Sequence, residues 1–349
     1  MDHDIFGLLK QLAEIPGPVG REGAVQHFLR NTWKEMGIKI SEDKVGNLFG
    51  RLEGDGKHIA VVGHADTIGF LVQQILPNGF LKVAFNTAAT TPDARFLSGV
   101  PLKFLTDVGP IEGHIGLRSG HLAGIEGKKK PVLFPEIFID LGIDSDQEVR
   151  ALGIDIGTPA IFASNVVHRQ RNIVGPGMDN RVALTLQCLL TDEILRRRAS
   201  PNLTLVSTVQ EEIGMKGAAA AALREKYDLV IIIDVGLVGD IPSSEQDFLP
   251  TKLGAGPIVV YKDFSIHYSI DNIKILEKSA QNSDIPIQKA VFSNFNTDGV
   301  HFFQRGHPTV MVAVPTRYTH TDFETVRMND VQATLDLLAA AILDEFNKP

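Results

Sequence analysis

The sequence holds almost no cysteine, no long apolar run and no excess of basic residues. Cys188 is the only cysteine among 349 residues, which excludes an internal disulfide and a metal cluster built on thiolates. No apolar run approaches the about 20 residues that a transmembrane helix needs. A net charge of −8 argues against a basic surface of the kind that binds nucleic acid. We therefore expect a cytoplasmic protein that binds neither nucleic acid nor membrane.

Two common catalytic motifs are also missing. The chain has no Gly-x-Ser-x-Gly sequence, which argues against a serine nucleophile on a strand-to-helix turn. It has no Walker-type phosphate loop either. What remains is an ordinary globular composition, with 44% hydrophobic and 22% charged residues. The length suits one large domain or a main domain with a smaller second one.

The pattern of residues changes between about 68 and 165. Segments there, such as IGFLVQQI, GFLKVAF and VPLKFL, are short, alternating and separated by glycine or proline. That pattern is typical of small antiparallel β-structure. We therefore predict an inserted β-rich domain over residues 68–165, and a main domain formed by residues 1–67 together with residues 166–349.

The main domain alternates apolar strands with amphipathic helices. Strands that are apolar on both faces need a cover on both sides, so the pattern predicts an α/β fold whose mixed sheet is sandwiched by helices. The expected strands are residues 58–66, 203–209, 229–234, 286–292 and 309–314. The expected helices are residues 4–14, 21–36, 180–198, 217–226, 271–282, 299–306 and 329–346.

Polar residues follow the expected strands at the points where sites of α/β sheets collect. Each is weak evidence alone, because an Asp after a strand is more often a turn or cap residue. The set nevertheless combines histidines with carboxylates and no thiolate, as a hydrolytic divalent-metal site requires. Its members are His64, Asp66, Asp179, Glu211, Glu212, Asp234 and His320.

Two metal ions fit this set better than one. A single catalytic ion uses about three protein ligands, whereas a bridging carboxylate would divide five ligands as three and three. In the strand-like pair Glu211-Glu212, consecutive side chains would point in opposite directions, so one could ligate while the other faces the substrate. Asp66, two residues beyond His64, is placed to orient that imidazole.

These residues resemble the tetrahedral aminopeptidases, a di-metal family that includes glutamyl and deblocking aminopeptidases. The resemblance runs along most of the chain through LAEIPGPVGREGAV, DKVGNLFG, GHADTIGF, GMDNR, QEEIG, DVG and PTRYTHTDFE. It implies a phosphorylase/hydrolase-like main fold with a PDZ-like insertion that helps dimer contacts. It further implies zinc or cobalt as the two metals, short peptides as substrates, and a homo-oligomer of twelve subunits.

The resemblance also assigns roles by position. His64, Asp179 and Asp234 would hold one metal, and Asp179, Glu212 and His320 the other. Glu211 would be the general base and Asp66 the residue that orients His64. The residues that would bind substrate are Thr297, Asp298, Arg317 and Tyr318.

The sequence departs from the family in the inserted domain, which carries HIGLRSGHL in place of the usual segment, and at two places in the main domain. Thr67 stands where the family usually has Glu after His-x-Asp, and the usual Gly-Gly-Thr-Asp loop is here Phe295-Asn296-Thr297-Asp298. None of these departures removes a ligand.

Our functional hypothesis is a di-metal aminopeptidase, in which a metal-bridging hydroxide attacks the scissile carbonyl and Glu211 relays the proton. One alternative is a hydrolase of the same fold that acts on an N-acyl group or a glycoside. A glycosidase needs two carboxylates facing each other about 5–10 Å apart, which adjacent glutamates provide poorly. A second alternative is a relative that has kept the fold without catalysis.

Overall fold

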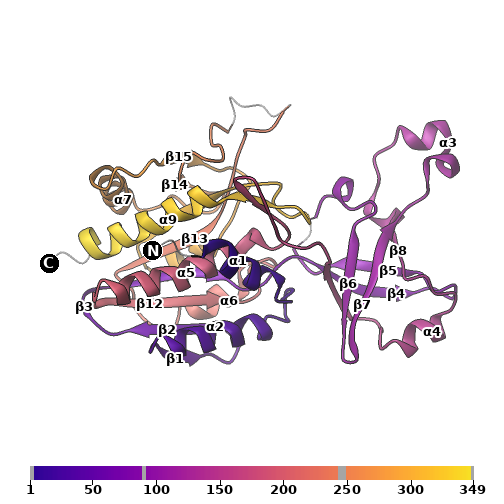
Figure 1. The fold of residues 1–349 in the computed structure, drawn as a ribbon, viewed down its shortest axis with the longest axis horizontal. Helices are drawn as coiled ribbons and strands as arrows, with labels where there is room; N and C mark the ends of the chain where they lie inside the picture. The colour runs from indigo at the N-terminus through magenta and orange to yellow at the C-terminus, as the bar shows by residue number, and fades with distance from the viewer. Residues whose placement is uncertain (1–3, 89–91, 243–248, 347–349) are drawn as a thin grey trace.

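The computed structural model describes residues 4–88, 92–242 and 249–346. The chain forms a large unit of helices around a sheet and a smaller unit set off to one side (Figure 1). Both chain ends that the figure marks belong to the large unit. The smaller unit is built from the middle of the sequence, as expected for an insertion.

The large unit is organised by a mixed sheet, which has eleven strands in the described part of the chain. Its main path runs β1-β2-β12-β3-β13-β16-β17-β11-β10, and β14 and β15 extend it beside β16. The strands are β1 (Lys39–Glu42), β2 (Leu48–Leu52), β3 (Asp55–His64), β10 (Val167–Arg169), β11 (Asn172–Val174), β12 (Pro201–Thr208), β13 (Leu229–Leu237), β14 (Ile258–Lys262), β15 (Gln288–Val291), β16 (Thr309–Arg317) and β17 (Thr325–Arg327).

The central strands β12, β3, β13 and β16 run parallel to one another. Their residues are β-branched and apolar, and β13 is buried from Leu229 to Gly236. Such strands fit only where helices cover both faces. Parallel pairing aligns their carboxyl ends, so that Thr208 lies opposite His64 in the register of β12 and β3.

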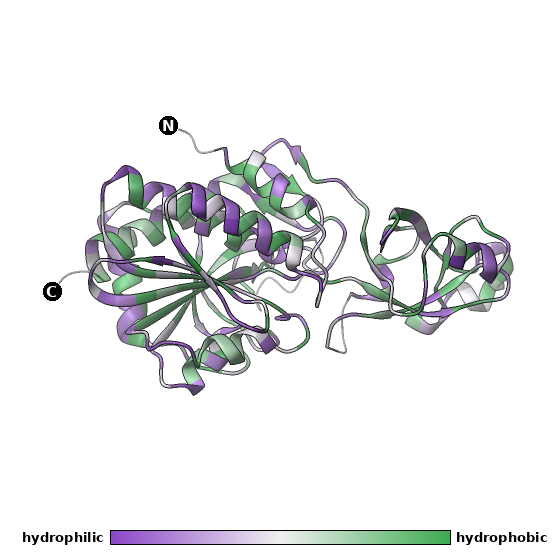
Figure 2. Cartoon of the chain, turned by 90° about the horizontal axis from the view of Figure 1, so that it is seen from below, coloured by the Kyte–Doolittle hydropathy of each residue, from purple (hydrophilic) through white to green (hydrophobic). Residues whose placement is uncertain are grey.

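Helices lie on both sides of this sheet (Figure 2). Helices α1, α5 and α9 contact one another, and α5 also contacts β3 and β13; α6 contacts α8, which in turn contacts β13 and β16. The helices are α1 (Ile5–Glu14), α2 (Gly23–Glu35), α5 (Met178–Arg196), α6 (Lys216–Ala221), α7 (Ile270–Asn282), α8 (Gly299–Gln304) and α9 (Met328–Ala340).

The smaller unit is a closed barrel of six antiparallel strands in the order β4-β5-β8-β7-β6-β9. It has its own hydrophobic core, separate from that of the large unit and formed by buried residues between Ile68 and Phe162. Its elements are β4 (Phe70–Ile75), β5 (Leu81–Phe85), β6 (Pro101–Thr106), β7 (Gly109–Gly116), α3 (Gly120–Lys128), β8 (Phe138–Asp140), α4 (Asp146–Ala151) and β9 (Pro159–Phe162).

The predicted α/β class, with its mixed sheet and separate small β-unit, is therefore confirmed, while the PDZ-like label and the boundaries at 68 and 165 stay predictions. Six strands of the main sheet were not expected, namely β1, β2, β10, β11, β14 and β17, and one expected element differs clearly. The helix expected over 217–226 ends at Ala221, because the chain tightens into turns before Leu229. No helix among the described residues is long and apolar enough to cross a lipid bilayer.

Candidate active site

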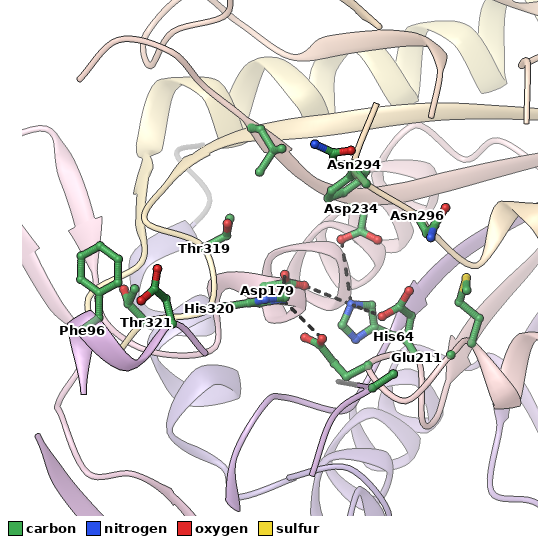
Figure 3. A pocket seen from close by; sticks show the side chains of 17 residues that line it. His64, Phe96, Asp179, Glu211, Asp234, Asn294, Asn296, Thr319, His320 and Thr321 are labelled. Carbon is green, nitrogen blue, oxygen red and sulfur yellow. Dashed lines mark hydrogen bonds and ion pairs between the residues drawn. The ribbon is translucent and has the colours of Figure 1, made fainter. Parts of the chain in front are cut away.

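The strand ends bring distant residues to one cavity of about 410 Å³. His64 is the last residue of β3, Asp234 lies within β13, and His320 follows β16. Asp179 comes from the start of α5. Close packing places it there, because Gly63 has no Cβ and a Cβ would lie 2.6 Å from that of Ala183 in α5. Figure 3 shows these side chains turned toward one another.

Asp179 stands between the two histidines. Its Oδ1 lies 3.1 Å from His64 Nε2, and its Oδ2 lies 3.3 Å from His320 Nε2. Its carboxylate is not used as a helix cap, because Asn180 Oδ1 accepts a hydrogen bond from the Ala183 N–H instead. Asp179 thus offers one oxygen to each histidine, as a bridging ligand does.

The two glutamates do not lie on a strand, which corrects the expectation that they point in opposite directions. Strand β12 ends at Thr208, and Gln210 has a left-handed φ of 55° that turns the chain. The Glu211 carbonyl then accepts hydrogen bonds from the Gly214 and Met215 N–H groups, which closes a turn. Both carboxylates line the same cavity as a result.

Asp66 is placed differently from the sequence-based prediction. The His64 Nδ1–H faces the backbone carbonyl of Asp66 at 3.1 Å, while the Asp66 carboxylate is farther away at 3.6 Å. That carboxylate accepts hydrogen bonds from the backbone N–H groups of Glu211 at 2.9 Å and Glu212 at 3.0 Å. Asp66 therefore holds His64 through its backbone and the glutamate turn through its side chain.

Glu324 is a residue that the sequence analysis did not single out. It is buried, and its Oε1 accepts a hydrogen bond from the His320 N–H at 2.7 Å. Its Oε2 accepts one from the Asp179 N–H at 3.1 Å. Its place four residues after His320, at the end of a polar loop and before a strand, was the available sequence signal. Two other buried residues beside the site, Glu22 and Arg181, were also missed.

The cavity gathers more negative charge than its histidines can balance. Burial, followed by repulsion from neighbouring carboxylates, raises the pKa of Glu211, Glu212 and Asp234. Burial also opposes ionisation of Asp179, but its hydrogen bonds with His320 and His64 hold the pKa of Asp179 well below its usual range. No lysine or arginine occurs among the described residues that line the cavity. Such a set of carboxylates is costly to bury without a cation.

The donor geometry fits divalent cations. His64, Asp179 and Asp234 offer ligand atoms within 4.8 Å of one another, and so do Asp179, Glu212 and His320. A third such group joins His64 with Glu211 and Glu212. Glu212 Oε1 is buried without a hydrogen-bond partner. Imidazole with carboxylate suits zinc and the neighbouring transition metals, so the residues present fit the predicted metals.

The four residues predicted to bind substrate do not line this cavity. Thr297 and Asp298 are buried, and the Asp298 carboxylate accepts a hydrogen bond from the Thr208 hydroxyl. Arg317 forms a two-pronged ion pair with Asp240, at 2.8 and 2.6 Å. Tyr318 is exposed, and its ring packs at a tilt against that of Phe323, with centroids 5.1 Å apart. Their predicted contacts with substrate stay predictions, which the cavity walls do not support.

Other side chains form the walls. Asn294, Phe295 and Asn296 precede the predicted substrate pair, and the remaining wall comes in part from the inserted segment through Ala88, Asp93 and Phe96. The Ala88 N–H donates to the Glu212 carbonyl at 3.0 Å. Phe96 packs against Phe323, with ring centroids 5.9 Å apart. The insertion therefore contacts both the glutamate turn and the loop that carries His320.

Comparisons with known proteins agree with this geometry. Residues 46–337 match the M42 glutamyl aminopeptidase family. FrvX of Escherichia coli K12, named as a candidate aminopeptidase, is 32% identical over 95% of this chain and 93% of its own.

Two solved structures share the fold. A TET aminopeptidase from the marine sediment archaeon Thaumarchaeota archaeon SCGC AB-539-E09 superposes with a TM-score of 0.92, at 25% identity, over 98% of this chain and 96% of that one. The Pyrococcus horikoshii TET1 peptidase, which can assemble into a tetrahedron or a large octahedral shell, gives a TM-score of 0.86 at 26% identity, over 98% of this chain and all of that one (100%).

Proposed function

The chain belongs to the M42 glutamyl aminopeptidase family and is a metallo-aminopeptidase, and from this premise we propose that it removes N-terminal residues from short peptides at a two-metal centre. The observation that carries the proposal is the position of Asp179, which presents one oxygen to His64 and the other to His320. One carboxylate shared by two histidine-carboxylate groups is the arrangement that a pair of divalent ions requires.

The ligands divide into two sets that share Asp179. His64 and Asp234 complete one set, and Glu212 and His320 complete the other. The His64 Nδ1–H donates to the Asp66 carbonyl, which leaves Nε2 as the atom that would bind metal. Divalent ions at these sets, zinc or cobalt in our proposal, would polarise the scissile carbonyl and lower the pKa of water.

Glu211 is the proposed general base and acid. Its carboxylate lies 4.0 Å from His64 Nε2 and lines the cavity beside the ligand sets. Burial raises its pKa, which moves the group toward the range where it can accept a proton from the attacking water and return it to the leaving amine. The Asp66 carboxylate accepts a hydrogen bond from the Glu211 N–H and so holds the turn that carries Glu211. The Glu211 carboxylate is therefore positioned before substrate arrives.

The matched pair Glu211→Gln and Glu212→Gln tests these roles. Loss of a general base costs about 10²–10⁴-fold in kcat, so Glu211→Gln should lose turnover of aminoacyl-anilides while it keeps both metal equivalents. Glu212→Gln should lose metal, measured by elemental analysis after dialysis. Wild-type turnover in Glu211→Gln contradicts the base assignment, and metal loss in that variant makes Glu211 a ligand, as the third donor group would allow.

We also propose that the protein self-associates, as a dodecamer built from dimers, in the cytoplasm. Val108 and Ile156 are our candidate contact residues on the barrel, where they are exposed by 77% and 65%. Analytical ultracentrifugation tests this: a single species of monomer mass would contradict the proposal, and Val108→Asp should shift the distribution toward smaller species if the barrel takes part.

A further inference from the structure

The second ligand set depends on a residue that binds no metal itself. His320 lies on a loop after β16 and has a left-handed φ of 64°, a conformation that non-glycine residues adopt only when surrounding contacts enforce it. Its side chain is 26% exposed, whereas that of His64 is 2% exposed. Packing alone therefore restrains His320 much less than His64.

The contact that restrains His320 comes from Glu324. The two oxygens of this carboxylate accept from the backbone N–H groups of His320 and Asp179, at 2.7 and 3.1 Å. Those two residues are 141 positions apart in sequence, counted from their numbers, and both belong to the second ligand set. Glu324 is only 1% exposed, so water cannot replace it as an acceptor.

We propose that Glu324 is a positioning residue that sets the spacing of His320 and Asp179 and thereby the metal affinity of the second set. This inference rests on the proposed two-metal centre. The two oxygens of the Glu324 side chain each accept from one N–H group, whereas a carboxamide has one acceptor oxygen and presents an NH₂ donor to the other N–H. The first set is affected less, since Glu324 holds only one of its three members.

The test compares Glu324→Gln with Asp330→Asn. Asp330 is also 1% exposed, and its carboxylate likewise accepts from two backbone N–H groups, those of Gly254 at 2.6 Å and Gly256 at 2.9 Å. It does not line the cavity. The control therefore removes the same kind of contact from a place where no metal is proposed.

Metal affinity is measured by titrating the metal-free full-length variants with zinc against a chelating dye, and the second set is followed by the visible spectrum after cobalt loading. We expect Glu324→Gln to lower the affinity for the more weakly bound of the two zinc equivalents by about 10–100-fold. The variant should also change the cobalt spectrum. Asp330→Asn should lower thermal stability yet leave both affinities and the spectrum unchanged.

Three results would overturn the inference: unchanged affinities in Glu324→Gln, an equal loss at both sets, or the same metal loss in Asp330→Asn. If Glu324→Gln does not fold, Glu324→Asp decides the question, since it keeps the charge but is too short to reach both N–H groups. Fewer than two zinc equivalents in the wild type would instead contradict the proposed two-metal centre itself.

Discussion

The two halves of the cavity are built in different ways. The half around His64 is formed at the end of β3, a central strand that lies between β12 and β13 in the sheet. The His64 imidazole is buried there. The half around His320 grows from a loop beyond β16, and a single buried carboxylate ties that loop to α5. The sheet itself fixes the first half, whereas side-chain hydrogen bonds fix the second. We therefore expect the first set to hold its metal more tightly.

The largest effect should come from the residue that the halves share. Asp179→Asn keeps the size of the side chain but removes its charge, so neither histidine keeps a bridging anion. We expect both metal equivalents and all measurable peptidase activity to be lost. Elemental analysis and an anilide assay measure this, and a variant that retained one tight metal would show that Asp179 serves one half alone.

Replacing each histidine should separate the halves. His320→Ala should lose about one metal equivalent and destabilise the metal-free protein less than His64→Ala does, because His320 is partly exposed. His64→Ala should also lose metal and, in addition, destabilise the metal-free protein by about 1–3 kcal/mol, because it leaves a gap under a buried strand end. Equal melting temperatures of the two metal-free variants would contradict the comparison.

In the metal-free protein, the titrating groups of both halves should lower the free energy of unfolding as pH rises. Burial and then Asp179 raise the pKa of Glu324 from 4.5 to about 8, and burial raises the pKa of Glu211 and Asp234 as well. His64 and His320 shift in the same direction, since their carboxylate partners outweigh the opposing effect of burial. The folded state thus binds more protons than the unfolded state across this window, and stability must fall as pH increases.

The corresponding experiment is thermal denaturation in chelator and in zinc. We expect the chelated protein to lose at least about 5 °C in melting temperature between about pH 5 and about pH 8. The stabilisation by zinc should grow over the same range, because the metals replace the protons. Glu324→Gln should flatten the chelated curve, and a chelated protein that became more stable toward pH 8 would refute this interpretation.

The smallest effect should come from the wall that the insertion contributes. Phe96 lines the cavity but lies in neither ligand set, so Phe96→Ala should leave metal content unchanged. Loss of an aromatic contact should raise KM about 2–10-fold. Leu122→Ala is the matched control, because Leu122 is an exposed apolar residue of the same insertion that does not line the cavity. An unchanged KM in Phe96→Ala would exclude the insertion from substrate binding.

Hydrophobic periodicity was sufficient to predict the class of the fold, because buried parallel strands such as β3, β13 and β16 are apolar on both faces. The same reasoning located the ligand candidates, since parallel strands end at a common edge. It failed for Glu211 and Glu212, where a left-handed Gln210 ends the strand alternation. Sequence spacing also could not show whether His64 meets the backbone carbonyl or the side-chain carboxylate of Asp66, because that depends on side-chain rotation.

Glu324 could not be identified from the sequence, for a different reason. Its two hydrogen bonds go to backbone N–H groups, which every non-proline residue carries. No residue type at the receiving positions marks such a contact. The carboxylate becomes informative only when the loop after β16 and the start of α5 are seen together.

The closure of the barrel limits how copies of this chain can meet. Every described strand of that unit has a neighbour on both sides, and a backbone edge remains only in part, as in β7, which pairs with β8 over residues 114–116 and with β6 alone over residues 109–113. Among the described strands, fully open backbone edges lie in the main sheet, at β1, β10 and β15. An interface on the insertion therefore depends mainly on side chains, which makes its strength and partner choice adjustable by point substitutions without any change in the barrel itself.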